Sequence, residues 1–397
     1  MADSNVFDFP TPAARAAPAG RRLIPARLLD ARKALRLTQE QLGSRVGVTR
    51  QSIAAYEAGD KTPEAETFAA LAAELKQPIA FFTAADRPVF GEYSPRFFRK
   101  VGPDTARRND ACAVLGHWFV QAACYLDELV NYPPVHIPEV QRPLDSSGRY
   151  TAEEIETAAE QCRQQWGLGW GPISNVLALL ESKGIAACRY PIEDERIDAF
   201  SFWSGDRPFI FMASEKEAGV RIRFDLAHEL GHLVLHRWIE AAEIADPKTL
   251  KVIESEADRF AGAFLLPRKS FPNDVYSARL DAFLDLKRRW IVSIQAMIYR
   301  CRDLEVIDDT QFTNLYKQIS FRKWRSKEPL DTPEEIKLEM PRLLGRAAQL
   351  VLESGRKHPD DLCTDLQLSP HLIEAFLNLP SGRLSVPPPT EFTPTLK

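Results

Sequence analysis

One short segment of the chain combines residue types that bind metal ions and move protons. In RFDLAHELGHLVLH, the residues His228, Glu229 and His232 form the pattern H-E-x-x-H. Residues four apart lie on the same face of a helix, so the two imidazoles can hold one zinc ion. Glu229 is then adjacent to a metal-bound water and can act as its general base. The pattern predicts a hydrolytic zinc centre, in preference to two histidines buried for structural reasons.

A third protein ligand has to come from another part of the chain. His236 follows four residues later, but a helix rises about 1.5 Å per residue, which puts it about 12 Å from His228 along the axis. We therefore expect His236 to support the centre or pack beside it without binding the same ion. Trp238 occupies the place where metzincins carry their third histidine. An acidic residue from a different helix is the better candidate.

The segment KVIESEADRFAGAFLLP, residues 251–267, supplies such an acidic residue. Its apolar positions recur at helical spacing, and Glu254 and Asp258 form a polar stripe beside them. In the E-x-x-x-D arrangement of gluzincins, the glutamate binds zinc and the aspartate orients a ligand histidine. We predict these roles for Glu254 and Asp258. Glu256 points about 200° away from Glu254; it is the alternative ligand, and otherwise a solvated surface charge.

A different pattern occupies the region near the N-terminus. Thr38 followed three residues later by Gln41 predicts a capping box at the start of a short helix. Gly47 can adopt a positive φ and end that helix, and a third helix begins at Thr49 and ends before Gly59. Two short helices joined by a tight glycine turn are typical of a helix-turn-helix unit.

The run T-Q-E-x-L-x-x-x-x-G-V-T-x-x-x-I-x-x-Y-E-x-G closely resembles the Xre and phage-repressor helix-turn-helix class. The resemblance implies that Arg50 and Gln51 read base edges, Arg with guanine and Gln with adenine. It also implies that Gln39 and Thr49 contact phosphate at helix N-termini. Ser52 extends this polar face, and residues 21–61 carry nine Lys and Arg against four Asp and Glu. Both features favour DNA over the alternative, a helical bundle that binds protein.

The metal-binding pattern also resembles a known family. H-E-L-G-H-L-V-L-H followed by E-x-E-A-D-R-F-A-G-A-F-L-L-P is similar to ImmA/IrrE-type zinc peptidases, over about residues 165–270. Both motifs in one chain resemble Xre-type regulators that carry an ImmA/IrrE domain. The resemblance implies a Zn2+-dependent endopeptidase that cleaves itself or a partner Xre-type repressor in a stress or mobile-element response. The alternatives are a transcription factor whose zinc fold is a sensor without turnover, and an antitoxin-type repressor.

Three apolar runs before the H-E-x-x-H helix predict a small sheet. They are GIAACRYPI, AFSFWSG and RPFIFM, and Gly-Asp-Arg-Pro between the last two predicts a hairpin. We expect the segment 209–212 to be an edge strand that holds an extended peptide by strand addition.

A peptidase also needs a donor for the developing oxyanion. The sequence leaves four candidates open: Tyr190, Arg221, Arg223 and His236.

The fold class that follows is multidomain and mainly α. We expect a lambda-repressor-like bundle, a small α+β gluzincin-like zinc peptidase domain and a helical C-terminal region. Residues 271–330 are basic, which fits either a second helix-turn-helix or a helical cap on the peptidase. The predicted parts are a disordered tail (1–20), the DNA-binding domain (21–83), a linker and helical connector (84–150), the peptidase domain (151–270), the basic helical region (271–330), the C-terminal helical region (331–380) and a disordered tail (381–397).

Composition narrows the class of protein further. The 397 residues carry a net charge of −4 and six cysteines, none in a C-x-x-C pair, which argues against disulfides and a cysteine zinc ribbon. No apolar run reaches about 18 residues, and the N-terminus lacks a secretory signal pattern. We expect a cytoplasmic protein without a membrane partner. We also expect a homodimer on a double-stranded operator, since one helix-turn-helix offers a small interface.

Overall fold

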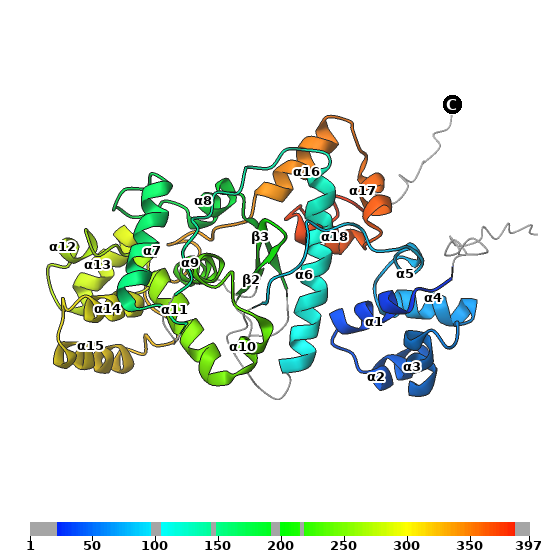
Figure 1. Cartoon of the computed structure of the whole chain (residues 1–397), viewed down its shortest axis with the longest axis horizontal. Coiled ribbons are helices and arrows are strands. Elements are labelled where there is room, and N and C mark those ends of the chain that lie inside the picture. Colours follow the sequence, from blue (N-terminus) through cyan, green and yellow to red (C-terminus); the bar gives the residue numbers. More distant parts are fainter. Residues whose placement is uncertain (1–21, 97–104, 144–147, 192–198, 215–217, 386–397) are drawn as a thin grey trace, which may run out of the picture.

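The computed structural model describes residues 22–96, 105–143, 148–191, 199–214 and 218–385. The chain is mainly helical with one small sheet, as the sequence predicts (Figure 1). The predicted tail at residues 1–20 and most of the tail at 381–397 lie outside the described residues. Residues 381–385 are described, and they pack against the protein: Leu384 is buried and donates its backbone N–H to Oε1 of Glu374 at 2.7 Å. The prediction of disorder from residue 381 is therefore wrong for this segment.

The N-terminal bundle contains the helices that the sequence predicts. Thr38 and Gln41 form the capping box, and Gly47 ends the following helix with a φ of 73°. Thr49 caps the third helix, and Gly59 ends it with a φ of 81°. The bounds are α1 Pro25–Ala34, α2 Gln39–Val46, α3 Arg50–Ala58, α4 Ala65–Glu74 and α5 Ile79–Thr83.

A long helix, α6 (Thr105–Asp127), lies between this bundle and the sheet (Figure 1). Helix α1 packs along it. Two ion pairs join the bundle to the connector: Arg27 with Asp86 at 2.8 Å, and Lys33 with Asp110 at 3.2 Å. Trp118 is fully buried in a core that the bundle and the sheet share. The N-terminal bundle therefore packs against α6 through its first helix, α1.

The sheet contains β1 (Ala186–Tyr190), β2 (Ala199–Ser204) and β3 (Arg207–Ala213) in the order β1-β3-β2. β2 and β3 form the predicted antiparallel hairpin, and β1 runs parallel to β3. The segment 209–212 is therefore in the central strand, and the prediction that it is an edge strand is wrong. β3 has a neighbour on each side, so it cannot accept a further strand. Within the described residues, β2 is paired on its outer side only near its end, where Tyr93 bridges Ser204.

The two faces of the sheet pack against different helical layers. Phe200, Phe202, Phe209 and Phe211 form one apolar face, which meets α6 and α18 through Phe119 and Phe376. The opposite face packs against α8 and α9 through a second core. Helices α16 and α18 of the C-terminal region contact β1, and α17 packs on α6. The bounds of these helices are α16 Leu343–Glu353, α17 Pro359–Leu366 and α18 Pro370–Phe376.

Two long helices carry the metal-binding motifs, α9 (Gly219–Leu235) and α11 (Pro247–Leu265). They pack closely because Gly231 has no side chain: a Cβ there would lie 3.2 Å from Cα of Ala257. Ser201 on β2 anchors α9 by donating its hydroxyl to the backbone oxygen of Glu229 at 3.3 Å. The neighbouring helices are α7 Ala152–Gln165, α8 Val176–Ser182, α10 Ala241–Ala245 and α12 Phe271–Asp274.

The basic region folds as α13 (Leu280–Trp290), α14 (Ile294–Asp303) and α15 (Asp309–Phe321), in contact with the peptidase core. Lys287 is fully buried and binds Glu328 at 2.9 Å and Asp331 at 2.7 Å. Arg300 is also buried and makes a bidentate pair with Glu156 on α7. Two of the cations that suggested a second DNA-binding unit thus hold the fold together, which favours a helical cap. No described helix is long and apolar enough to cross a membrane.

Candidate metal centre and nucleic-acid interface

The packing of α9 on α11 brings three predicted ligands together. Nε2 of His228 and Nε2 of His232 are 3.1 Å apart. Glu254 reaches across from α11, with Oε2 3.4 Å from the first nitrogen and Oε1 3.4 Å from the second. Tetrahedral zinc with bonds of about 2.0–2.1 Å separates its ligand atoms by about 3.3 Å. Two imidazoles and one carboxylate at these separations fit a zinc ion with one position left open.

The charge on Glu254 supports the same interpretation. Both of its carboxylate oxygens are buried, and the polar contacts that the described residues offer them are those at 3.4 Å to His228 and His232. Burial alone would raise its pKa, but His228 and His232 outweigh that effect and hold the pKa well below the usual range. An ionised buried carboxylate in this position needs positive charge beside it, which either a bound metal ion or a protonated His228 can supply.

Asp258 lies beside the first imidazole, as predicted. Its Oδ1 is 2.8 Å from Nδ1 of His228. When Nδ1 carries the proton and donates a hydrogen bond to this carboxylate, Nε2 is unprotonated and can bind a metal. Asp258 comes one helical turn after Glu254, so a single stripe of α11 faces both nitrogens of the same ring.

His236 belongs to a second buried chain of contacts. Its Nδ1 is 2.9 Å from Nδ1 of His232, and its Nε2 is 2.8 Å from Oε2 of Glu256. The other oxygen of Glu256 accepts the backbone N–H of Tyr150 at 2.9 Å. Both ring nitrogens of His236 are engaged, so it supports His232 and is not placed to donate to an oxyanion. Burial holds the pKa of His236 well below its usual value, which keeps the ring neutral.

The interpretation of Glu256 as a solvated surface charge is wrong. The residue is only 5% exposed, and burial raises its pKa to about 7. Among the described residues, the group able to hold a metal contains Glu254 and does not include Glu256. The sequence missed this role because Tyr150 lies 106 residues away in the chain, and no local pattern links the two.

Glu229 lies on the same buried surface of α9. Its Oε2 has no hydrogen-bond partner in the described part of the chain, and the residue is 4% exposed. Burial raises its pKa to about 7. A carboxylate with a pKa near neutrality can both take and return a proton at physiological pH.

A cleft of about 700 Å³ opens beside the centre between α9, α11 and α14. Asp258, which contacts His228, lines it, while the three candidate ligands themselves do not. Of the remaining oxyanion candidates, Arg221 lines this cleft. Arg223 is buried against Glu339 and three backbone carbonyls. The ring of Tyr190 packs against Phe376. The cleft therefore favours Arg221 among these three.

The predicted base-reading residues lie on the outer side of the N-terminal bundle. Arg50 and Gln51 are exposed at the start of α3, and α2 and α3 lie away from α6 (Figure 1). Oγ1 of Thr49 accepts the backbone N–H of Ser52 at 3.2 Å, which fixes the start of that helix. The amide of Gln39 donates to Glu57 at 2.8 Å. Because the bundle packs against α6 through α1, the face predicted to read bases remains exposed.

Comparison with protein families agrees with both motifs. A helix-turn-helix model matches residues 28–82, and a peptidase M78 model, the IrrE N-terminal-like domain, matches residues 180–302. No curated protein matches the chain. The two matches lie on the regions that contain α1–α5 and the candidate zinc ligands. The chain therefore joins an Xre-like DNA-binding helix-turn-helix to an IrrE/ImmA-like domain of the M78 peptidases.

Proposed function

We propose that the chain is a cytoplasmic transcriptional regulator whose IrrE-like domain is a zinc-dependent endopeptidase. The observation that carries the proposal is the position of Glu229. It is buried, its Oε2 has no hydrogen-bond partner among the described residues, and it is next to His228 and His232, whose nitrogens converge with the oxygens of Glu254. Three protein ligands beside a general base are typical of catalytic zinc sites. Structural zinc sites are instead closed by a fourth protein ligand.

Each residue has a distinct part in the proposed hydrolysis. Bound zinc would polarise the scissile carbonyl and lower the pKa of its bound water. Glu229 accepts a proton from the attacking water and returns it to the leaving amine, for which a pKa of about 7 is suitable. Asp258 and His236 keep His228 and His232 in the tautomers that present Nε2.

The substrate we propose is the chain itself or a partner Xre-type repressor, cleaved in a stress or mobile-element response. The cleft beside Asp258 is open and large enough for several residues of an extended chain. The DNA-binding part is proposed to hold a double-stranded operator as a homodimer. Cleavage would then remove repression at the site where the regulator is bound.

The decisive experiment compares wild-type protein with Glu229→Gln, both loaded with zinc. Each is incubated alone and with Xre-type regulators encoded beside it, and chain integrity is followed by mass spectrometry. We expect cleavage by the wild type only, with equal zinc content in both proteins. Cleavage by both would refute the role of Glu229. No cleavage by either would favour a regulator whose zinc domain acts as a sensor without turnover.

A further inference from the structure

A second hollow, of about 300 Å³, lies at the C-terminal end of α9. It is lined by Trp203 of β2, by Leu233 and Val234 of α9, by the following Trp238, and by the segment 137–142. None of the candidate zinc ligands lines it. The hollow is within the size range of pockets that hold small organic molecules. We call it the tryptophan pocket.

Two arginines stand over the tryptophans of this pocket. The guanidinium of Arg237 lies 4.1 Å from the ring centre of Trp203, and that of Arg142 lies 4.2 Å from the ring centre of Trp238. Arg142 has no ion pair within the described residues. Arg237 pairs with Asp206, whose side chain is fully exposed, and such pairs contribute little. Both cations are therefore available to an anionic ligand, with apolar surface between them.

The remaining polar groups narrow the ligand class. Trp203 is 5% exposed, and its indole Nε1 has no acceptor among the described side chains and backbone. A carboxylate can satisfy this donor together with the arginines. Glu139 also lines the pocket, which keeps the net positive charge small. One carboxylate on an apolar body fits this balance better than a polyphosphate does.

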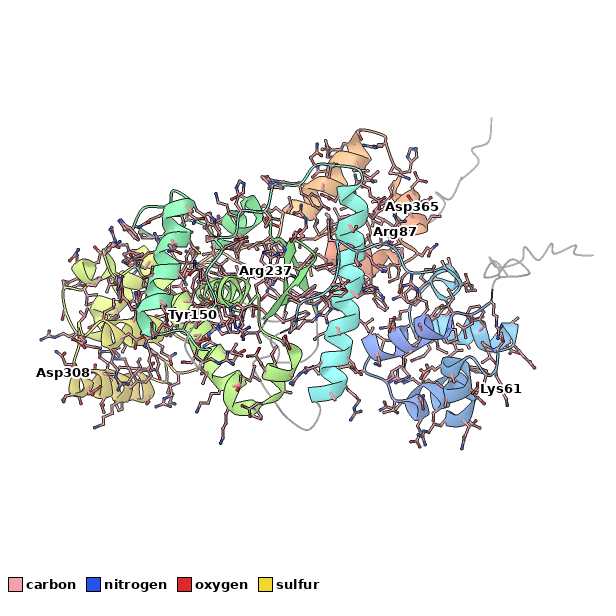
Figure 2. All side chains as sticks on the ribbon, in the orientation of Figure 1. Lys61, Arg87, Tyr150, Arg237, Asp308 and Asp365 are labelled. Carbon is pink, nitrogen blue, oxygen red and sulfur yellow. The ribbon has the colours of Figure 1, made fainter. Side chains whose placement is uncertain are left out.

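The tryptophan pocket is linked to the candidate zinc ligands by a buried chain of contacts. Nε1 of Trp238 donates to the hydroxyl of Tyr150 at 3.1 Å, and the backbone N–H of Tyr150 donates to Glu256 at 2.9 Å. Glu256 binds His236 at 2.8 Å, and His236 binds His232 at 2.9 Å. Arg237 lies near the middle of the molecule, and Tyr150 lies to its lower left, near the lower end of α7 (Figure 2).

We propose that the tryptophan pocket binds a compact organic carboxylate with an apolar body, and that occupancy alters zinc binding through Tyr150, Glu256 and His236. A ligand that moves Trp238 shifts Tyr150, which fixes the position of Glu256. The first part of the proposal, binding of a carboxylate (the binding half), depends only on the pocket. The second part, the effect of that binding on zinc affinity (the coupling half), rests on the zinc centre of the proposed function.

The binding half is tested by calorimetry on the zinc-free full chain with benzoate, phenylacetate and hexanoate. The neutral amides of the same acids are the matched ligand controls. We expect one site per chain for at least one acid, and at least tenfold weaker binding of its amide. Arg142→Gln and Arg237→Gln should each weaken binding by roughly 10- to 100-fold, the usual range for charge-assisted hydrogen bonds. Arg288→Gln, an exposed arginine paired with Asp285 away from the pocket, should have no effect.

Two results would overturn the binding half. One is the absence of binding by all three acids at millimolar concentration. The other is binding that neither arginine substitution weakens, because the carboxylate would then lie elsewhere. Neither measurement depends on hydrolysis, so loss of the proposed peptidase activity leaves this test intact.

The coupling half is tested by zinc competition against a chelator, with and without saturating carboxylate. We expect zinc affinity to change at least about fivefold, and carboxylate affinity to change by the same factor on zinc loading. Tyr150→Phe keeps the backbone N–H that binds Glu256 but loses the hydroxyl that accepts from Trp238. The hydroxyl also donates to the backbone oxygen of Gln141 at 3.2 Å, in the segment that lines the pocket, so this variant is compared at a carboxylate concentration that saturates it, and it should then lose the shift. Equal zinc affinity in both states, or an undiminished shift in Tyr150→Phe, would refute the coupling.

Discussion

Oδ1 of Asp258 lies 2.8 Å from Nδ1 of His228, while Glu254, one turn earlier on the same helix, faces Nε2 of the same ring at 3.4 Å. Two carboxylates on one face of α11 thus contact the two ring nitrogens of His228. The two carboxylates have different surroundings, since the Asp258 side chain is 42% exposed and that of Glu254 is 12% exposed. The buried carboxylate is placed to bind a cation, and the exposed one is placed to orient its neighbour.

Replacement of Asp258 by Asn tests this division of roles. The amide keeps the size of the side chain but removes the charge that fixes the proton on Nδ1 of His228. We expect zinc affinity to fall about 10- to 100-fold, as is usual when such an orienting group is lost. Chelator competition measures the change. Asp303→Asn is the matched control, because Asp303 lines the same cleft but pairs with Arg259. Equal losses in both variants would contradict the assigned role.

The third ligand can be identified by comparing Glu254→Gln with Glu256→Gln. The first substitution removes an oxygen ligand, so stoichiometric zinc should be lost. The second disturbs only the support of His236, so zinc should remain bound with a weaker affinity. Metal content after dialysis, measured by atomic emission, separates the two results. If Glu256→Gln alone loses its zinc, the ligand assignment is wrong.

Zinc affinity should rise with pH. Burial lowers the pKa of His228, but its contacts with the carboxylates of Asp258 and Glu254 outweigh burial and raise the pKa to about 10 in the metal-free protein. At neutral pH a proton therefore competes with zinc, and each unit of pH below that pKa weakens binding about tenfold. Chelator competition between pH 6.5 and 8.5 measures this slope. In Asp258→Asn the slope should level off at a lower pH, and a flat profile in the wild type would refute the competition.

Short-range periodicity was enough to place the residues of the candidate metal centre on common helix faces. H-E-x-x-H and E-x-x-x-D are spacings within single helices, so the sequence alone places each pair on one face. The burial of Glu256 was missed because it depends on Tyr150 and His236, which come from other elements. Periodicity placed Glu256 off the stripe that carries Glu254 and Asp258, but it could not show what packs against Glu256.

Short-range periodicity could not predict the order of the strands in the sheet. Three apolar runs and one hairpin turn predict the elements, but the parallel pairing of β1 with β3 depends on the long connection between them. Burial of cations is a second long-range effect. Lys287 and Arg300 look like surface residues in the sequence, yet carboxylates 41 to 144 residues away neutralise them.

The pair of Arg300 and Glu156 should determine whether the basic helices stay attached to the peptidase core. Arg300→Met leaves the carboxylate of Glu156 buried without its partner, which should destabilise the protein by about 3–5 kcal/mol. Denaturant unfolding measures the loss. The double variant with Glu156→Leu should recover most of the stability, since no unpaired charge remains. If the double variant is as unstable as the single one, the charge pair is not the cause.

Arg50 should carry sequence preference in DNA binding. It is exposed at the first turn of α3, where its guanidinium can pair with a guanine edge. After an operator is selected from random duplexes, Arg50→Ala should lose about 1–3 kcal/mol of discrimination at one base pair. Zinc content should be unchanged, because α3 lies on the far side of α6 from the metal centre (Figure 1). Arg288→Ala, on the peptidase cap, is the control and should leave discrimination intact. Equal discrimination by wild type and Arg50→Ala would exclude Arg50 as a base reader, and an equal loss at every sequence would assign it to phosphate instead.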